Sequence, residues 1–314
     1  MSGTKGAFQS QVNGIPAPGL SGGFCDFNPA FSVAGGPGGI VAGNSGLLVG
    51  RFAWLSTQGM DPDSGPQIAN NFGYGVIPDG LVPRSGQQAL ITPYLAGASE
   101  QIPQGFPAWL LAGGRGLWVR NNGSSVAYRG MKAYANFSTG AVSFAPTGSP
   151  TTASLTTSSI AAGTAISVTG SIAGNVLTVT NVATGVVYPG AILTGVGVAT
   201  GTQVVAQLTG TAGGVGTYAL NYGEQNIASE TISGTYGVLT VGAGTPISGG
   251  VLSGSGVTAG TTVWGQLTAS TWVVSPSQTA ASTTITENVN IETKFIALSG
   301  GAVGELVKVS DQIQ

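Results

Sequence analysis

The stretch that decides the fold runs from residue 176 to residue 220 and reads VLTVTNVATGVVYPGAILTGVGVATGTQVVAQLTGTAGGVGTYAL. Val, Leu or Ile alternates with Thr in segments such as 176–179, and Gly-rich turns interrupt the alternation every eight to twelve residues. A period of two is typical of β-strands with one buried face. The stretch therefore predicts a small all-β module.

The same pattern occurs a second time further along the chain, at an offset that falls from 62 through 59 to 53 residues. We therefore predict two tandem β modules, at 171–234 and 235–286, each small enough to gain from packing against the other. Residues 146–170 are rich in Ser, Thr and Ala and are predicted to be a linker, with further strands as the alternative. The matched segments are 176–179 with 238–241, Gly201-Thr202 with Gly260-Thr261, 207–209 with 266–268, and Gln225 with Gln278.

Charge and proline content indicate that these modules are inserted into a different domain. Of the 20 charged residues, 12 lie between Lys5 and Lys132 and six between Glu287 and Asp311. Thirteen of the 16 prolines precede residue 151, whereas 29 of the 34 threonines follow residue 150. We predict a discontinuous host domain made of residues 49–145 and 287–314.

The host domain also has the pattern of β-strands. Residues 117–120 are expected to form a hairpin with 126–129, and 133–137 with 141–144, because Asn, Gly and Ser supply the turns. Residues 291–309 read as two strands around Ser299-Gly300-Gly301. Together with the modules, this predicts an all-β fold whose host domain is a β-barrel or resembles a β-sandwich.

Residues 1–48 have a composition of their own. Gly, Pro and Ser dominate, and large apolar residues come singly, so the segment can bury little within itself. We expect an extended arm that lies along a partner. Apolar and backbone contacts would dominate its binding, since Asp26 is the single charge between residues 9 and 50.

Composition excludes several classes of function. The chain has no His, which removes Ser-His and Cys-His nucleophiles, and its one Cys cannot form an internal disulfide. A formal charge of −2 argues against general nucleic-acid binding. The absence of a signal sequence or a long apolar run predicts a soluble protein made in a cytoplasm, with no membrane partner. So few charges at a mean hydropathy of +0.30 predict a homo-oligomer, a dimer or trimer.

Other candidate sites have simpler structural interpretations. The glycine cluster at 35–39 lacks the Lys of a phosphate loop, and 61–64 (DPDS) lacks the Gly and Glu of a calcium loop. Glu224 and Glu230 could suggest a glycosidase pair but read as solvated loop carboxylates, and Cys25 as an apolar filler. We predict no cofactor, metal or catalytic residue. Five aromatic residues could stack on sugars, although core packing is favoured: Tyr188, Tyr218, Tyr222, Trp264 and Trp272.

A series of short runs occurs in order along the chain: 8–18 (FQSQVNGIPAP), 27–29, 36–43 (GPGGIVAG), 50–54 (GRFAW), 88–92, 102–107 (IPQGFP), 134–137, 292–294 and 304–309. These runs resemble the structural cement (capsid decoration) proteins of tailed bacteriophages, and the Gly/Thr-rich modules resemble those of phage head and tail fibres. The resemblance implies a non-enzymatic virion protein on the outer capsid surface that clamps neighbouring major capsid protein subunits. A head-fibre or adhesin role, with modules that bind host glycans, is the alternative, and a capsule-degrading enzyme comes third.

Capsid contacts are expected mainly from the arm, where isolated aromatic side chains would enter a groove between coat subunits. The residues assigned to this contact are Phe8, Phe24, Phe27, Phe31, Ile40, Arg51 and Trp54.

Overall fold

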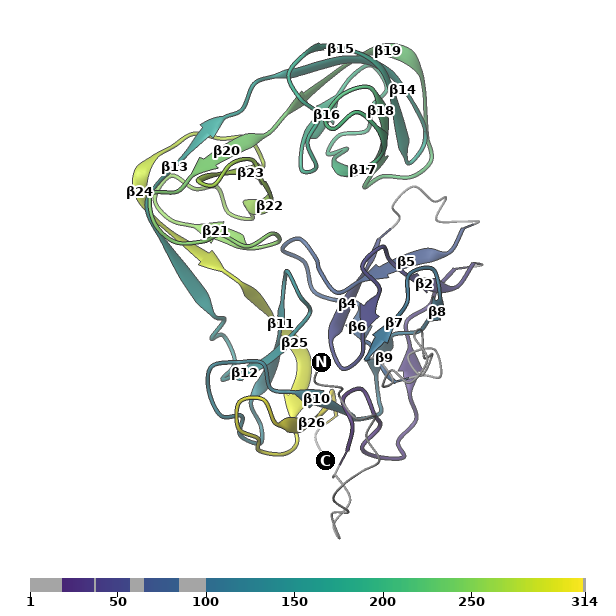
Figure 1. The fold of residues 1–314 in the computed structure, drawn as a ribbon, viewed down its shortest axis with the longest axis vertical. Coiled ribbons are helices and arrows are strands. Elements are labelled where there is room, and N and C mark those ends of the chain that lie inside the picture. Colours follow the sequence, from purple (N-terminus) through teal and green to yellow (C-terminus); the bar gives the residue numbers. More distant parts are fainter. Residues whose placement is uncertain (1–18, 37, 57–64, 85–99, 313–314) are drawn as a thin grey trace, which may run out of the picture.

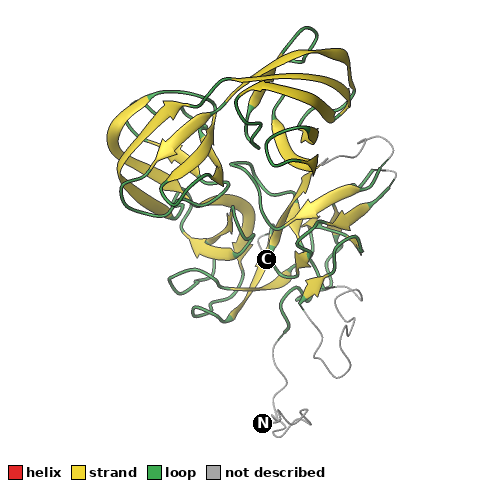
Figure 2. Ribbon diagram, turned by 45° about the horizontal axis from the view of Figure 1, so that its top comes forward, coloured by secondary structure: helices red, strands yellow, loops and turns green. Residues whose placement is uncertain are grey.

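A computed structural model describes residues 19–36, 38–56, 65–84 and 100–312. Every regular element in these residues is a β-strand, and Figure 2 shows strands and loops there without a helix. The predicted all-β fold class is therefore confirmed. Within the described ranges, no helix has the length and apolar character needed to cross a membrane.

Two sheets build the body of the molecule, the lower part in Figure 1. The seven-stranded sheet has the order β1 (Phe31–Ser32), β9 (Leu111–Gly113), β6 (Gly80–Leu81), β4 (Phe52–Ser56), β5 (Gln67–Asn70), β2 (Ile40–Ala42) and β8 (Pro107–Ala108). The five-stranded sheet has the order β10 (Leu117–Arg120), β26 (Leu306–Ser310), β25 (Asn290–Ala297), β11 (Lys132–Asn136) and β12 (Val142–Ala145). A small sheet pairs β3 (Leu47–Leu48) with β7 (Gln101–Ile102).

The two large sheets share one apolar core. Phe52 of the first sheet meets Phe295 of the second edge to face, with ring centroids 5.8 Å apart. Leu111 and Val309, again one from each sheet, are fully buried in the same cluster. Strands that precede the modules and strands that follow them are thus held together by common hydrophobic burial.

The C-terminal strands complete the five-stranded sheet. β25 pairs antiparallel with β11, where Tyr134 faces Glu292, and β26 pairs with β10 over the whole length of β10. The two strands predicted around Ser299-Gly300-Gly301 are confirmed, as is the hairpin of β11 and β12. Whether the host domain folds independently stays a prediction.

The other predicted hairpin, 117–120 with 126–129, is wrong. β10 pairs with β26 instead, and within 126–129 Ala127 makes only a bridge to Gly301. The reason is Asn121, whose buried side chain donates hydrogen bonds to the backbone oxygens of Ser125 and Gly301. These bonds fold residues 121–125 into a compact loop, so the return segment cannot lie beside β10.

The extended-arm prediction fails for residues 40–48. Ile40, Ala42 and Leu47 are buried in a core cluster with Ala53 and Ile102. The reason is strand pairing: β2 pairs parallel with β5, and β3 pairs with β7. Apolar residues that stand alone in the sequence thereby gain buried neighbours from distant strands. Residues 1–18 lie outside the described residues.

The linker prediction for 146–170 is also wrong over most of its length. The segment contains β13 (Thr152–Ala162) and the start of β14 (Ile166–Gly174). Most of the Ser and Thr side chains of β13 are exposed, whereas Leu155, Ile160 and Ser158 are buried. A Ser/Thr-rich composition fits a half-exposed strand as well as a linker.

Two modules project from the body. The barrel is a closed ring of β13, β20 (Gly237–Thr240), β23 (Thr271–Ser275), β22 (Thr262–Gln266), β21 (Val251–Ser253) and β24 (Ala280–Asn288). The first module is a six-stranded sheet in the order β16 (Ile192–Thr194), β19 (Gln225–Thr235), β14, β15 (Val176–Thr184), β18 (Gly216–Leu220) and β17 (Val204–Gly210). β13 closes the barrel although it precedes the first module, so the two modules predicted in tandem at 171–234 and 235–286 are nested instead. The first module is inserted between β13 and β20 of the barrel, and the barrel is inserted between β12 and β25 of the body.

The residues matched between the modules make the same buried contact in both. In the first module the Gln225 side chain donates to Thr202 Oγ1 (3.1 Å) and accepts from the Ala199 N–H. In the barrel, Gln278 donates to Thr261 Oγ1 and accepts from the Thr258 N–H. Each pair satisfies a buried threonine hydroxyl, which explains why these polar types recur at matched positions.

Candidate functional site

The segment 22–32 lies along the edge of the body formed by β9 and β10. Gly22 donates to the Trp118 oxygen (2.7 Å), Trp118 donates to Gly23 (2.8 Å), and Phe31 pairs with Gly113. Asp26 fixes the turn between these pairings, because its carboxylate accepts hydrogen bonds from the backbone N–H groups of Gly116 and Asn28. The backbone of this segment is therefore held in place by residues that are distant in sequence.

Three phenylalanines on this fixed segment face solvent, and we call them the phenylalanine strip. Phe24 is 37% exposed, Phe27 98% and Phe31 58%. The Phe24 ring packs against the Trp109 ring, with centroids 5.9 Å apart. The Arg115 guanidinium lies 4.5 Å from the centroid of the Phe24 ring. Three exposed phenylalanines within eight residues of one bonded segment make this segment a candidate interaction surface.

The other predicted contact residues have different surroundings. Ile40 and Trp54 are buried, at 6% and 4% exposure, so their side chains pack in the fold rather than present a surface. Arg51 is half-buried and donates to the Thr139 backbone oxygen (3.0 Å). Phe8 lies outside the described residues.

Cys25, next to the phenylalanine strip, is not a reactive thiol. It is half-buried, and burial together with the adjacent Asp26 carboxylate raises the pKa of its thiol to about 11. The thiolate, which is the nucleophilic form, is therefore scarce at neutral pH. This agrees with the interpretation of Cys25 as a small apolar filler.

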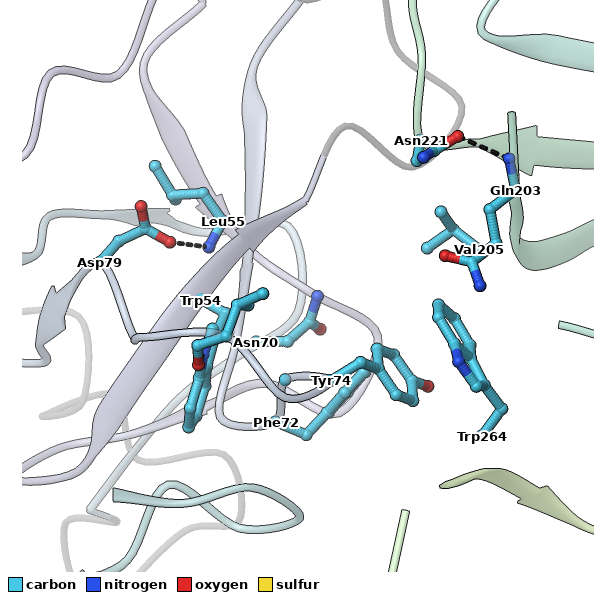
Figure 3. Close-up of a pocket in the computed structure, with 12 residues that line it drawn as sticks. Trp54, Leu55, Asn70, Phe72, Tyr74, Asp79, Gln203, Val205, Asn221 and Trp264 are labelled. Carbon is cyan, nitrogen blue, oxygen red and sulfur yellow. Dashed lines mark hydrogen bonds between the residues drawn. The ribbon is translucent and has the colours of Figure 1, made fainter. Parts of the chain in front are cut away.

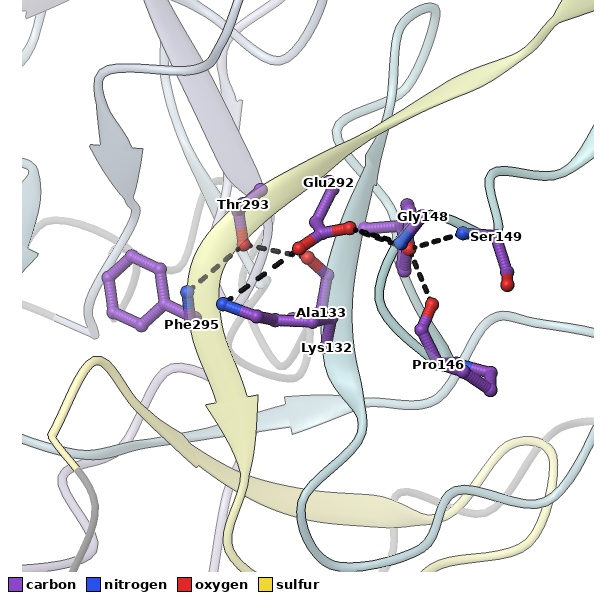
Figure 4. A network of polar contacts seen from close by, with 9 residues as sticks. Lys132, Ala133, Pro146, Gly148, Ser149, Glu292, Thr293 and Phe295 are labelled. Carbon is purple, nitrogen blue, oxygen red and sulfur yellow. Dashed lines mark hydrogen bonds and ion pairs between the residues drawn. The ribbon is translucent and has the colours of Figure 1, made fainter.

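The modules leave the body through a turn fixed by Glu292 of β25, shown in Figure 4. Glu292 Oε2 accepts from the Gly148 N–H (2.7 Å) and from the Tyr134 hydroxyl (3.0 Å), and Oε1 lies 3.9 Å from Lys132 Nζ. The Tyr134 hydroxyl in turn accepts from the Ser149 N–H (2.9 Å). The Gly148 bond, with smaller contributions from Tyr134 and Lys132, lowers the pKa of Glu292, so its carboxylate stays charged and keeps the turn bonded.

A pocket of about 390 Å³ lies where the body, the first module and the barrel meet (Figure 3). Tyr74 of the body stacks on Trp264 of the barrel, with ring centroids 4.0 Å apart and planes at 9°. Gln203 of the first module donates to Ser275 of the barrel (2.8 Å). The lining is mainly apolar, and its residues are Trp54, Leu55, Asn70, Phe72, Gly73, Tyr74, Val76, Asp79, Gln203, Val205, Asn221 and Trp264.

Most of the aromatic side chains of the modules that could stack on sugars are buried in the fold. Tyr218, Trp264 and Trp272 are buried, at 0%, 8% and 8% exposure, whereas Tyr222 is 46% exposed. The backbone of Gly190, at φ +93°, lies directly against the Trp264 ring, so a Cβ at this position would clash with the ring. Core packing, the favoured interpretation of Tyr218 and Trp272, is confirmed.

The structure places the carboxylates Glu224 and Glu230 differently from one another. Glu230 is half-buried within β19, so its interpretation as a loop carboxylate is wrong, whereas Glu224 is exposed just before that strand. No three Asp, Glu, Cys or His residues among those described gather as a metal site would require. The segment 61–64 falls outside the described residues.

One buried carboxylate, Glu287, was not singled out from the sequence. It is 0% exposed and lies on β24 beside the junction with the body. The available signal was its position, since it is the first charged residue after a long stretch that contains only two others.

A family model described as XM1 gp53 minor capsid protein matches residues 8–178, more than half of the chain. The match covers the body up to β12, the whole of β13 and β14, and ends within β15. No curated protein and no solved structure matches the chain.

Proposed function

The chain belongs to the XM1 gp53 minor capsid protein family, a family of phage structural proteins, and from this premise we propose that it is a non-enzymatic cement protein of the phage head. It binds the outer surface of the capsid, after assembly in the host cytoplasm, and clamps adjacent major capsid protein subunits. Burying surface on two neighbours at once makes their separation under DNA pressure more costly, and many identical contacts make weak ones sufficient.

The phenylalanine strip is the observation that carries this proposal. It lies on the body, the part matched by the family model, and its backbone is bonded to β9 and β10, so little ordering entropy opposes binding there. In Figure 1 the modules lie above β9 and β10, the strands to which the segment that carries the strip is bonded. An adhesin role receives less support, because most of the aromatic side chains that could stack on glycans are buried.

We expect the double variant Phe27→Ser/Phe31→Ser to bind empty heads at least about a hundredfold more weakly. Each side chain contributes about 1.5–3 kcal/mol when it passes from solvent into a groove, and about 1.4 kcal/mol corresponds to a tenfold change in affinity. Co-sedimentation with empty heads measures the effect. Raised salt should change binding little, because the two side chains are apolar and Asp26 is the only charged residue between residues 9 and 50.

The matched control is Val196→Ser/Val215→Ser, which removes two exposed apolar side chains of the first module, 82% and 48% exposed. This control should bind as the unmodified protein does. Equal binding by the phenylalanine variant would contradict the assignment of the strip, and loss of binding in both variants would point to a general loss of solubility.

We also propose that the protein forms a symmetric dimer or trimer on the head. Its 20 charges among 314 residues leave a sparsely charged surface, part of which an assembled state would cover. Cryo-electron microscopy of virions is the measurement, and it should show copies in contact around a symmetry axis. Single copies that do not touch one another would contradict this proposal.

A further inference from the structure

Glu287 is placed where the barrel joins the body. It lies near the end of β24, one residue before that strand ends, and it pairs with Ala153 of β13 and Leu252 of β21. Its side chain is 0% exposed. A charged group enclosed in this way is unusual, because burial of an ion without a partner is costly.

The carboxyl group has only one hydrogen-bond partner. Oε1 accepts from the Ile247 N–H at 2.9 Å, whereas Oε2 is buried with no partner. The backbone of Gly250 lies so close that a Cβ there would come within 1.9 Å of Oε1. A neutral carboxyl group fits this enclosure better than a carboxylate, which needs more hydrogen bonds to replace its water.

The segment bonded to Glu287, residues 246–250, is also the segment that attaches the barrel to the body, and we call it the docking loop. Ile247 packs on the apolar core of the body. Gly249 accepts a hydrogen bond from the Gly75 N–H (3.1 Å) and lies so close that a Cβ would come within 2.0 Å of the Gly73 oxygen. Glu287 thus accepts a hydrogen bond from the docking loop, and the same loop packs against the body.

No cation compensates this carboxyl group among the described residues. The docking loop, β13 and β21 contain no titratable side chain, and β24 contains only Glu287. On the body side the titratable group is Tyr74, whose phenol pKa is raised by burial and which therefore stays neutral. Lys132, on β11 of the five-stranded sheet, pairs with another carboxylate, because its Nζ lies 3.9 Å from Glu292 Oε1.

We propose that Glu287 is a protonation-controlled lock, which holds the barrel on the body while its carboxyl group is neutral and loosens the docking loop when it ionises. Burial raises the pKa of Glu287 to about 7, despite the opposing effect of the Ile247 hydrogen bond. A carboxyl pKa that is raised in the docked state favours docking at low pH, and this stabilisation is lost as pH rises from the ordinary value toward 7. The lock does not depend on the proposed role on the capsid.

Hydrogen exchange of the full chain tests the lock. The Ile247 amide bonds to Glu287, and the Gly75 amide bonds across the junction to Gly249. After correction for the intrinsic exchange rate, both amides should open on the order of fiftyfold more often at pH 8 than at pH 5. This factor follows from a pKa of about 7 in the docked state and of 4.5 in the open state. The Leu193 amide, in the first module, should show no such change.

Glu287→Gln, a neutral side chain of the same shape, should remove the pH dependence at Ile247 and Gly75. The control is Glu230→Gln, which alters a half-buried carboxylate that also has an unpartnered oxygen but lies away from the junction, and it should leave the pH dependence intact. In the unmodified protein, the carboxyl carbon resonance that Glu287→Gln removes should titrate near pH 7. A midpoint below pH 5, or pH-independent exchange at Ile247, would overturn the proposal.

Discussion

Replacement of Trp264 by alanine will destabilise the modules by about 3–5 kcal/mol, the usual range for loss of a large buried aromatic side chain. The ring is 8% exposed and contributes to the core of the first module although it belongs to the barrel. It also stacks on Tyr74 of the body. A single side chain thus fills space between three parts of the molecule, and its removal leaves a cavity that no one part can close alone.

Urea denaturation followed by circular dichroism is the measurement for Trp264→Ala. Val196→Ala, at a side chain 82% exposed, serves as the control and should shift stability by less than about 0.5 kcal/mol. A double-mutant cycle with Tyr74→Ala should give a coupling of about 0.5–1.5 kcal/mol, as for other stacked aromatic pairs. A change below about 1 kcal/mol for Trp264→Ala would show that the junction is not closely packed in solution.

Excision of residues 152–288 will leave a body that folds and still binds empty heads. Thr151 and Val289 are already adjacent, because the Val289 N–H donates to the Thr151 oxygen (3.0 Å), and Thr151 donates to Asn290 Oδ1 (2.7 Å). A short glycine turn can therefore join these ends without moving β12 or β25. The phenylalanine strip remains in the shortened chain.

The shortened body will nevertheless be less stable than it is within the full chain. Ile247 and Val251, which pack on its core from the barrel, are removed, at a cost of up to about 1.5–3 kcal/mol each. Thermal unfolding and co-sedimentation with empty heads should show a lower midpoint and unchanged binding. An insoluble or non-binding product, together with independent folding of residues 1–145, would contradict the predicted boundaries of the host domain.

The amino-acid sequence determined the features that depend on local pattern. The alternation in 176–179 and 238–241 predicted strands, which the structure contains as β15 and β20. The turn residues between 137 and 141 predicted the hairpin of β11 and β12. Periodicity and turn chemistry act over a few residues, so they can be recognised without knowledge of the fold.

Only the tertiary structure decided which strands are partners and which side chains are covered. β10 pairs with β26, nearly 190 residues away, rather than with the segment that follows it. Ile40 and Trp54 read as contact residues but are buried by distant strands, whereas Phe27 is left outside. In the sequence nothing distinguishes Glu287 from other charged residues, and its burial results from enclosure by β13, β21 and the docking loop. Burial and pairing are properties of segments that meet in space, and a period of two specifies a strand's two faces but not its neighbours.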